Sequence, residues 1–159
     1  MKDAANSEKD RQHHAAPFMG QVIGFKVRRL HGLIQSGWAE WFAGYDLRLT
    51  PMQGGMLILV SDNPGLTQTG LAGLLGIEPP TLSQSISPLL ERGLIERRKV
   101  NGDKRAHALH LTKVGADAVA LVRREIPRHE KAVLERLNPG EQRELHRLLD
   151  KALGDGDAA

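Results

Sequence analysis

With 159 residues, the chain is long enough for one globular domain, or for one domain with helical extensions. Hydrophobic residues make up 40% and charged residues 26%, which is ordinary for a soluble globular protein. A net charge of +3 permits binding to nucleic acid without requiring it, and the absence of cysteine excludes disulfides and thiol-based sensing. No apolar run is long enough to cross a bilayer and no signal peptide begins the chain, so we expect a cytoplasmic protein.

The first 16 residues are polar and lack periodicity, so we expect a flexible arm. From Phe18 to Phe42 apolar residues recur every three or four positions, which predicts one long amphipathic helix. A capping box follows, in which Thr50 and Gln53 flank a proline at the first helical position. It predicts a buried core helix through Met56 to Val60, which ends at the turn residues 62–65.

The next stretch has the pattern of a helix-turn-helix. Thr67 can cap a short helix that runs to Leu75, and Gly76 can adopt the left-handed conformation that ends it. A second helix from about Pro80 to Arg92 has a buried stripe of leucine and isoleucine and stops at Gly93. The other face of this helix carries Thr81, Ser83, Gln84 and Ser87.

Two strands are predicted after this helix. The first, LIERRKV, begins at Leu94, and the second, RAHALHLT, ends at Thr112, with the turn residues Asn101, Gly102 and Asp103 between them. A helix pair followed by a basic hairpin is a winged helix. The predicted fold class is therefore mainly α with a small β wing, flanked by N- and C-terminal helices.

The C-terminal part predicts two further helices. One runs from Thr112 to Ile126, where Pro127 kinks or ends it, and the other begins at the capping box of Asn138 and Glu141. These helices carry more apolar surface than one small domain can obviously cover. A symmetric dimer would bury it and would place two recognition helices about 34 Å, one DNA turn, apart.

Three parts of this pattern resemble the MarR (multiple antibiotic resistance regulator) family of bacterial transcription factors. The resembling residues are Leu71-Ala72 with Leu75-Gly76-Ile77, Thr81-Leu82-Ser83 with Glu91-Arg92-Gly93-Leu94-Ile95, and Asp103-Lys104-Arg105-Ala106 leading to Leu111-Thr112 and Gly115. The resemblance covers roughly residues 18–153. It implies a homodimeric repressor that binds a palindromic operator in double-stranded DNA.

The resemblance also divides the chain into five parts. These are a flexible arm at 1–16, an N-terminal dimerisation helix and linker at 17–49, a winged helix-turn-helix DNA-binding lobe at 50–112, C-terminal dimerisation helices at 113–154 and a disordered tail at 155–159. In the resembled family the helix that matches residues 18–42 joins the C-terminal helices in a dimer interface. The alternative is that this helix packs only on its own domain.

The predicted recognition helix departs from the family because its exposed face has no basic side chain. Between His31 and Glu91 the only lysine or arginine is Arg48. Phosphate contacts supply most non-specific affinity for DNA. We therefore expect these contacts from the helix N-terminus, where free amides join the hydroxyls of Thr81 and Ser83, and from the basic hairpin.

The hairpin holds most of the local positive charge, and in the resembled family its basic tip enters the minor groove. That match falls on Lys104 and Arg105, with Asp103 orienting them; the alternative is a solvated charged hairpin. Gln84 can read adenine in the major groove or can be an ordinary exposed glutamine, and Pro88 can bend the helix. The candidate DNA-binding residues are Thr81, Ser83, Gln84, Ser87, Arg97, Arg98, Lys104 and Arg105.

Members of the resembled family commonly bind a small aromatic or phenolic acid between the dimer helices and the DNA-binding lobe, and then release DNA. At that junction this chain concentrates aromatic residues, with a histidine and an arginine available to meet a carboxylate. Alternatively, these aromatics belong to the core or to the dimer contact. The candidate ligand-binding residues are His31, Trp38, Trp41, Tyr45 and Arg48.

The sequence contains no phosphate-binding glycine loop, no Gly-x-Ser-x-Gly, no His-Glu-x-x-His and no cysteine nucleophile, so we expect neither an enzyme nor a cofactor. Two other classes stay open. The bare recognition helix favours a winged helix that has become a protein-interaction module, and the seven histidines favour a metal-sensing regulator. The salt dependence of DNA binding tests the first class, and the metal content of the purified protein tests the second.

Overall fold

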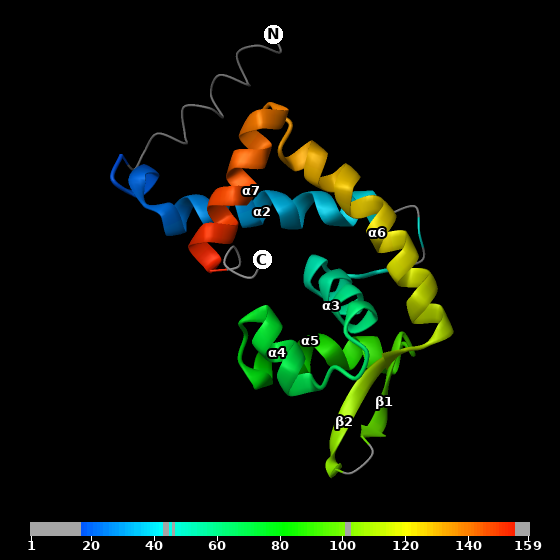
Figure 1. Cartoon of the computed structure of the whole chain (residues 1–159). Coiled ribbons are helices and arrows are strands. Elements are labelled where there is room, and N and C mark those ends of the chain that lie inside the picture. The colour runs from blue at the N-terminus through cyan, green and yellow to red at the C-terminus, as the bar shows by residue number, and fades with distance from the viewer. Residues whose placement is uncertain (1–16, 43–44, 46, 101–102, 155–159) are drawn as a thin grey trace.

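The computed structural model describes residues 17–42, 45, 47–100 and 103–154, without the side chains of residues 39–41, 100 and 103–106. The predicted arm at 1–16 and tail at 155–159 lie outside the described residues. Long helices form an upper lobe, and a smaller lobe with the two strands lies below it (Figure 1). The elements are η2 (Met19–Gln21), α2 (Ile23–Phe42), α3 (Pro51–Asp62), α4 (Gln68–Leu75), α5 (Pro79–Glu91), β1 (Ile95–Val100), β2 (Asp103–Leu111), α6 (Lys113–Val133) and α7 (Pro139–Leu153).

The predicted fold class is confirmed: α3, α4, α5 and the hairpin form a winged helix, with the helices of the upper lobe beside it. The predicted caps explain where its helices begin and end. The Thr50 hydroxyl accepts from the Gln53 amide at 3.2 Å, and the Gln53 side chain accepts from the Thr50 amide at 3.0 Å. Thr67 caps α4 through the amide of Gly70, and Gly76 ends α4 in the left-handed conformation with φ 61°.

The core of the winged-helix lobe is built around α3. Its residues Met56 and Leu57 are fully buried and belong to one hydrophobic cluster with Ile86 of α5, Leu109 of β2 and Val122 of α6. Burial of leucine and isoleucine side chains on α5 stabilises by about 2 kcal/mol each, which fixes the buried face of this helix and leaves its other face outward.

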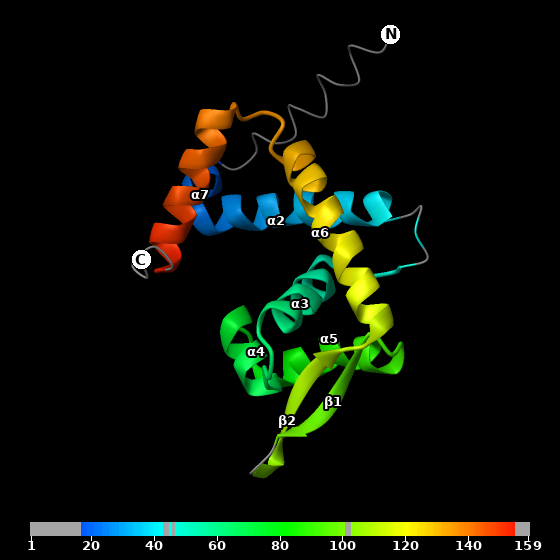
Figure 2. The same ribbon diagram turned by 45° about the vertical axis from the view of Figure 1, so that its right-hand side comes forward.

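The wing is an antiparallel hairpin in which Ile95 pairs with Leu111 and Arg98 with Ala108, with an irregularity between Lys99 and Val100. The strand β2 also contacts the segment before α4, because Ala108 forms a bridge with Thr67 and the Leu109 amide donates to the carbonyl of Leu66 at 2.8 Å. The hairpin therefore extends from the lobe and is anchored to it at one end (Figure 2).

The helix α6 leaves the wing directly. Thr112 caps it through the Gly115 amide, and Gly115 lies against the backbone of Leu94, where a methyl group would overlap the carbonyl oxygen. We expected Pro127 to kink or end this helix. The helix continues to Val133, so it does not end at Pro127. Buried Glu125 and His129 flank Pro127 on the packed face, and these contacts hold the helix together although one backbone hydrogen bond is lost.

The predicted helix from Phe18 to Phe42 is also shorter than expected. Residues Met19–Gln21 form a 3-10 turn, Val22 is extended, and α2 begins only at Ile23. Phe18 and Ile23 are 77% and 76% exposed, so within one chain little apolar burial offsets the unfavourable helical free energy of Gly20.

The last helix, α7, lies near α2 and α6 in the upper lobe (Figures 1 and 2) and has no buried residue. Its capping box forms as predicted. The Asn138 side chain accepts a hydrogen bond from the backbone amide of Glu141, and the backbone amide of Asn138 donates to the Glu141 carboxylate. Leu148 and Leu153 on this helix are 48% and 72% exposed. None of the described helices is long and apolar enough to span a membrane.

Candidate nucleic-acid interface

The outer face of α5 is polar and uncharged except at its ends. Leu82, Ile86 and Leu89 pack into the core, and the predicted DNA-binding residues of this helix lie elsewhere on its circumference. Thr81, Ser83 and Gln84 are exposed and Ser87 is half-buried. Four of the predicted residues are thus brought together on one helix.

Two serines of this face donate their hydroxyl hydrogens to the helix itself. Ser83 Oγ donates to the carbonyl of Pro79 at 3.0 Å, and Ser87 Oγ donates to the carbonyl of Ser83 at 2.8 Å. Such bonds are common for serine inside a helix. The hydroxyl oxygens keep their lone pairs for an outside donor.

The N-terminus of α5 offers fewer amides than the sequence suggested. Pro79 and Pro80 occupy its first two positions and have no N–H, and the amide of Leu82 already donates to Glu78. Of the four amides that an α-helix normally leaves without an intrahelical partner, only those of Glu78 and Thr81 exist here. The helix N-terminus therefore offers fewer donors to a phosphate than expected, because its first two residues are prolines.

The first basic residue after α5 is Arg92, and its side chain forms a hydrogen bond within the winged-helix lobe. Its guanidinium donates to the carbonyl of Arg48 at 2.6 Å, across the end of α5. Together with Gln53 and Pro88, the two arginines line an open hollow. This contact ties the segment before α3 to the C-terminal end of α5.

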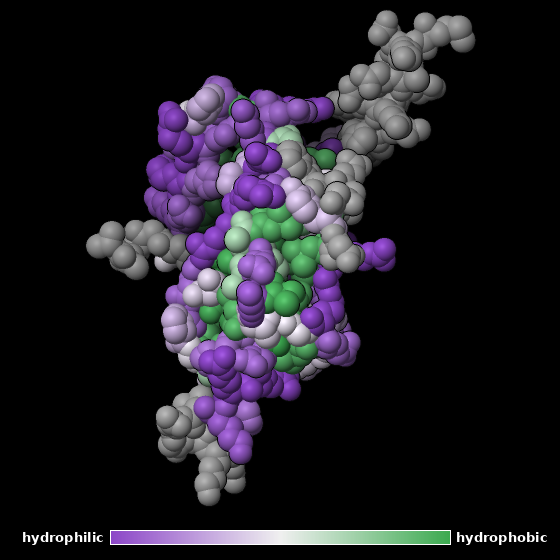
Figure 3. All heavy atoms as spheres, turned by 90° about the vertical axis from the view of Figure 1, so that its right-hand side faces the viewer, coloured by the Kyte–Doolittle hydropathy of each residue, from purple (hydrophilic) through white to green (hydrophobic). Residues whose placement is uncertain are grey.

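The described positive charge of the wing lies on β1. Arg97, Arg98 and Lys99 are all exposed, but Arg98 is paired with Glu96 through two hydrogen bonds of 2.8 and 2.5 Å. The backbone of Asp103, Lys104 and Arg105 belongs to β2, and the side chains of these three predicted residues lie outside the described part. Seen from the side of α6, hydrophilic atoms reach onto the wing and apolar atoms gather above it (Figure 3).

The aromatic junction predicted as a ligand site is partly core. Trp38 is only 5% exposed, its indole N–H donates to the carbonyl of Leu49 at 2.8 Å, and its ring stacks on Phe42 at 4.6 Å between centroids. His129 of α6 contacts the same indole edge-on at 5.6 Å. These contacts join the end of α2, the segment before α3 and the middle of α6.

A charged cluster lies next to these rings. The Tyr45 hydroxyl donates to Glu125 at 3.3 Å, and Arg124 donates to the Tyr45 oxygen at 2.9 Å and to Glu125 at 2.8 Å. Arg128 lies 3.5 Å from the same carboxylate. The hydrogen bond from Arg124 lowers the pKa of Glu125, and the charge of Arg128 lowers it further, while desolvation acts in the opposite direction.

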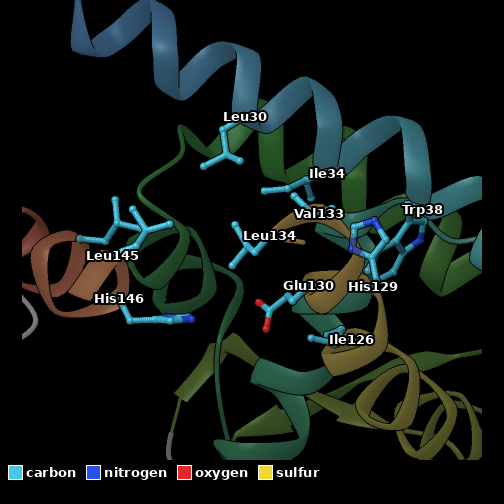
Figure 4. Close-up of a pocket in the computed structure, with 11 residues that line it drawn as sticks. Leu30, Ile34, Trp38, Ile126, His129, Glu130, Val133, Leu134, Leu145 and His146 are labelled. Carbon is cyan, nitrogen blue, oxygen red and sulfur yellow. The ribbon is translucent and has the colours of Figure 1, made fainter. Parts of the chain in front are cut away.

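An apolar cavity of about 220 Å³ opens between α2, α6 and α7. Figure 4 shows the Glu130 carboxylate and the His146 ring pointing into it, while Trp38 and His129 lie together at one side. Most of the remaining wall is aliphatic, formed by Leu30, Ile34, Ile126, Val133, Leu134, Leu145 and Leu149. The cavity thus combines a large apolar surface with three titratable groups, Glu130, His146 and His129.

The predicted ligand residues whose side chains are described do not share this cavity. Of these four, only Trp38 lines it, whereas Arg48 lines the hollow at the end of α5. His31 is exposed on α2 next to Gln35, and Tyr45 faces Arg124. The backbone of Trp41 belongs to α2, but its side chain lies outside the described residues.

Three residues of α6 that face this junction, Glu125, His129 and Glu130, were not among the predicted ligand residues. The expected helix was described only to Ile126, where Pro127 was expected to kink or end it. A signal was present, since Ala118, Val122, Glu125 and His129 recur at three or four positions and continue one buried face through Pro127.

Comparison with known proteins adds an independent observation. The sequence model described as MarR family matches residues 49–106. A putative transcriptional regulatory protein for the hcr operon of Thauera aromatica is 29% identical, over 92% of this chain and 87% of that protein. The structure of the transcriptional repressor CouR bound to a 23-mer DNA duplex matches with a TM-score of 0.77 and 28% identity, over 87% of this chain and 96% of that chain. The chain is therefore similar to transcriptional regulators over most of its length, and residues 49–106 match the model of the MarR family.

A further structure, that of a probable transcriptional regulator from Pseudomonas aeruginosa, has the same fold with a TM-score of 0.76 and 24% identity, over 84% of this chain and 98% of that chain. The proteins that this chain resembles are transcriptional regulators, not enzymes. The resemblance drawn from the sequence is therefore confirmed. In the described part of the chain, no three histidine or acidic side chains gather as metal ligands would.

Proposed function

We propose that this regulator is a homodimeric repressor, which binds a palindromic operator through α5 and the wing and is released by a small aromatic ligand. The observation that carries the dimer is α7, a helix of 15 residues without a buried residue. Within one chain such a helix gains little stability, because most helical stability in proteins comes from packing of an apolar face. Since the proposed target is DNA, we expect the protein to act in the cytoplasm.

The proposed dimer interface combines residues 17–49 and 113–154, around α2 and α7. Beside Leu148 and Leu153 of α7, the exposed Phe18, Ile23 and Leu33 add apolar surface from the N-terminal end of the chain, in the same lobe. A large exposed apolar surface on one lobe is typical of an interaction site, and in a homodimer the same surface of both copies forms the interface. The winged-helix lobe, 50–112, then projects from each side of the dimer.

Leu148→Glu tests the dimer. A charge in the centre of a buried apolar contact is unfavourable, so we expect this variant to sediment as a monomer where the wild type sediments as a dimer. Leu74→Glu is the matched control, because Leu74 is 57% exposed on α4, away from the proposed interface. Analytical ultracentrifugation at micromolar concentration measures both, and a wild-type monomer would contradict the proposal.

The proposed DNA surface consists of the outer face of α5 and the basic wing. Its residues are Thr81, Ser83, Gln84 and Ser87 on α5, and Arg97, Arg98, Lys104 and Arg105 on the wing, with Asp103 orienting the last two. The structure of CouR with a DNA duplex supports this surface by analogy. Because α5 contributes no cation, we assign most phosphate contacts to the wing.

DNA binding is tested by fluorescence anisotropy of the purified protein with the intergenic DNA upstream of its own gene and with a scrambled duplex, at low and moderate salt. We expect tight binding to the first duplex only, and loss of this binding in the Lys104→Ala, Arg105→Ala double variant. Equal or weak binding to both duplexes at moderate salt would instead favour a protein-interaction module.

For the ligand, we propose the cavity between α2, α6 and α7, at the edge of the candidate ligand residues. A cavity of about 150 Å³ is large enough for benzene, so the volume of about 220 Å³ found here fits a substituted ring. The carboxylate of Glu130 favours a phenolic hydroxyl as its partner over a second carboxylate. A second structure of CouR, 26% identical with a TM-score of 0.76, contains p-coumaroyl-CoA, which supports a phenolic ring as ligand.

The ligand proposal is tested by adding p-coumaroyl-CoA or salicylic acid to the protein bound to its DNA. A ligand that prefers the state unable to bind DNA lowers the affinity for DNA by its differential affinity for the two states. We expect one of these compounds to release the DNA, and His146→Ala to require more of it. Arg143→Ala, on the same helix and outside the cavity wall, is the control, and DNA binding unchanged by either compound would count against this class of ligand.

A further inference from the structure

The outer face of α5 presents hydrogen-bond acceptors where DNA-reading helices commonly present the donors of arginine or lysine. We propose that this helix reads its operator by accepting hydrogen bonds from the amino groups of adenine and cytosine. It would therefore select amino bases over keto bases on one DNA strand. The inference deepens the proposed function and rests on it, since it requires α5 to lie in the major groove.

The two serines supply the first acceptors. A hydroxyl has one hydrogen and two lone pairs. In Ser83 and Ser87 the hydrogen is already donated to the carbonyls of Pro79 and Ser83, so outside the helix these oxygens can only accept. Both lie on the same side of α5, one helical turn apart.

Pro88 supplies another acceptor. In a helix the carbonyl of residue 84 receives the amide hydrogen of residue 88, and proline has none. Gln84 is exposed, and no side chain in the described part of the chain donates to its carbonyl oxygen. This oxygen therefore lacks the amide hydrogen that it would otherwise accept within the helix, and it keeps its acceptor capacity.

The charge around these oxygens supports the same reading. The only ionisable side chain of α5 is that of Glu91, which is exposed, and Glu78 precedes the helix. The usual contact to guanine needs paired donors from arginine or lysine, and α5 has neither. A keto oxygen of guanine or thymine would meet a lone pair, whereas an amino group would meet an acceptor.

The major groove presents these choices at corresponding positions. Adenine N6 and cytosine N4 are amino donors, whereas guanine O6 and thymine O4 are acceptors. On the strand that faces α5, the proposal therefore predicts adenine or cytosine at the contacted positions. The side chain of Gln84 can add a preference for adenine among these, because it pairs with both N6 and N7.

The test is selection of binding sites from duplexes with a randomised half-site, followed by sequencing, with the full-length protein. We expect an enriched motif with adenine or cytosine on one strand at adjacent positions. Ser83→Ala and Ser87→Ala should each weaken the amino preference at one position, and Pro88→Ala should do so at another, because its new amide pairs with the Gln84 carbonyl. The matched controls are Ser36→Ala and Pro127→Ala, which remove a helix-bonded serine and an intrahelical proline outside α5.

Replacement of one selected adenine by 2-aminopurine sharpens the test. This base still pairs with thymine, but its amino group lies in the minor groove. Loss of one neutral hydrogen bond should weaken wild-type binding about 3- to 10-fold, and the variant that lacks the matching acceptor should not respond.

Two results would overturn the inference in distinguishable ways. Specific binding with guanine or thymine at the contacted positions, or with a motif unchanged in all three α5 variants, would overturn the inference and leave the proposed function standing. No enriched motif, together with equal binding to the upstream and scrambled duplexes, would overturn both.

Discussion

At the scale of single residues, Gly115 determines how closely α6 can approach the wing. A methyl group at this position would overlap the carbonyl oxygen of Leu94, a backbone atom that cannot move without displacing β1. We expect Gly115→Ala to lower the free energy of unfolding by about 1–3 kcal/mol, as overpacking does elsewhere. Urea denaturation measures the change.

Gly73→Ala is the matched control for that substitution. Gly73 is exposed on α4, and a methyl group there would meet no atom within 4 Å. Alanine is the better helix former, so this variant should gain about 0.5–1 kcal/mol. Equal effects of the two substitutions would show that the approach of α6 to Leu94 is not tight.

The lowered pKa of Glu125 makes the stability of the fold depend on pH. The hydrogen bond from Arg124 and the charge of Arg128 lower the pKa of this carboxyl in the folded state, below its value of about 4.3 in an unfolded chain. Its ionised form therefore stabilises the fold above about pH 4.3, and this contribution is lost as the pH falls through the lower, folded-state pKa. We expect the difference in Tm between wild type and Glu125→Gln to shrink steadily from about pH 5 to pH 3.

The control for Glu125 is Glu144→Gln. The pKa of Glu144 is also lowered, by its hydrogen bond with Arg147, but both side chains of that pair are more than half exposed. Solvent screens such a pair, so its pH-dependent difference in Tm should be smaller. A difference that stays constant with pH in Glu125→Gln would remove the ionic explanation.

At the scale of elements, the structure separates what the sequence can predict from what it cannot. The caps at Thr50, Thr67 and Asn138 were predicted because each depends on residues only three positions away. The length of α6 was not, because Pro127 is a local signal for an ending. The contacts that continue the helix join Glu125 to Tyr45 and His129 to Trp38, about 80 or more positions apart in the chain.

In the candidate site, too, the sequence predicted some features and not others. Periodicity was sufficient to place Thr81, Ser83, Gln84 and Ser87 together on one helix, because a helix has a fixed repeat. The bonds that convert two serines into pure acceptors, and the pairing of Arg98 with Glu96, depend on rotamers that a sequence pattern does not specify. For the aromatic residues, the sequence left a ligand site and a core position open, and it could not show that Trp38 donates its indole N–H to the carbonyl of Leu49.

The basic residues of the wing should determine how DNA affinity depends on salt concentration. If Lys104 and Arg105 each neutralise one phosphate, their replacement by alanine should lower the magnitude of the slope of log K against log salt by about 2. The slope is measured by anisotropy over several salt concentrations. Lys131→Ala with Arg136→Ala changes the net charge equally on or just after α6 and should leave the slope nearly unchanged. Similar changes in both double variants would mean that overall charge, and not the wing, determines the slope.

At the scale of the whole molecule, α6 links the two proposed activities. Its 21 residues span about 30 Å, from Gly115 at the wing to the cavity wall at Val133. Its middle is fixed to α2 by the contact of His129 with Trp38, and to Tyr45 just after α2 by that of Glu125. A ligand between α2, α6 and α7 would therefore bind at one end of the helix that positions the wing at the other, which gives the proposed release of DNA a direct structural route.

A rigid dimer also predicts a fixed distance between operator half-sites. Two recognition helices about 34 Å apart fit half-sites one turn apart, so insertion of 5 base pairs would turn one half-site to the opposite side of the duplex. We expect the affinity of the wild type to fall to that for a single half-site, as measured by anisotropy at constant salt. Leu148→Glu, the expected monomer, should bind both duplexes with the same low affinity. If the wild type tolerates the insertion, the two winged-helix lobes bind independently, and the dimer does not determine the geometry of the operator.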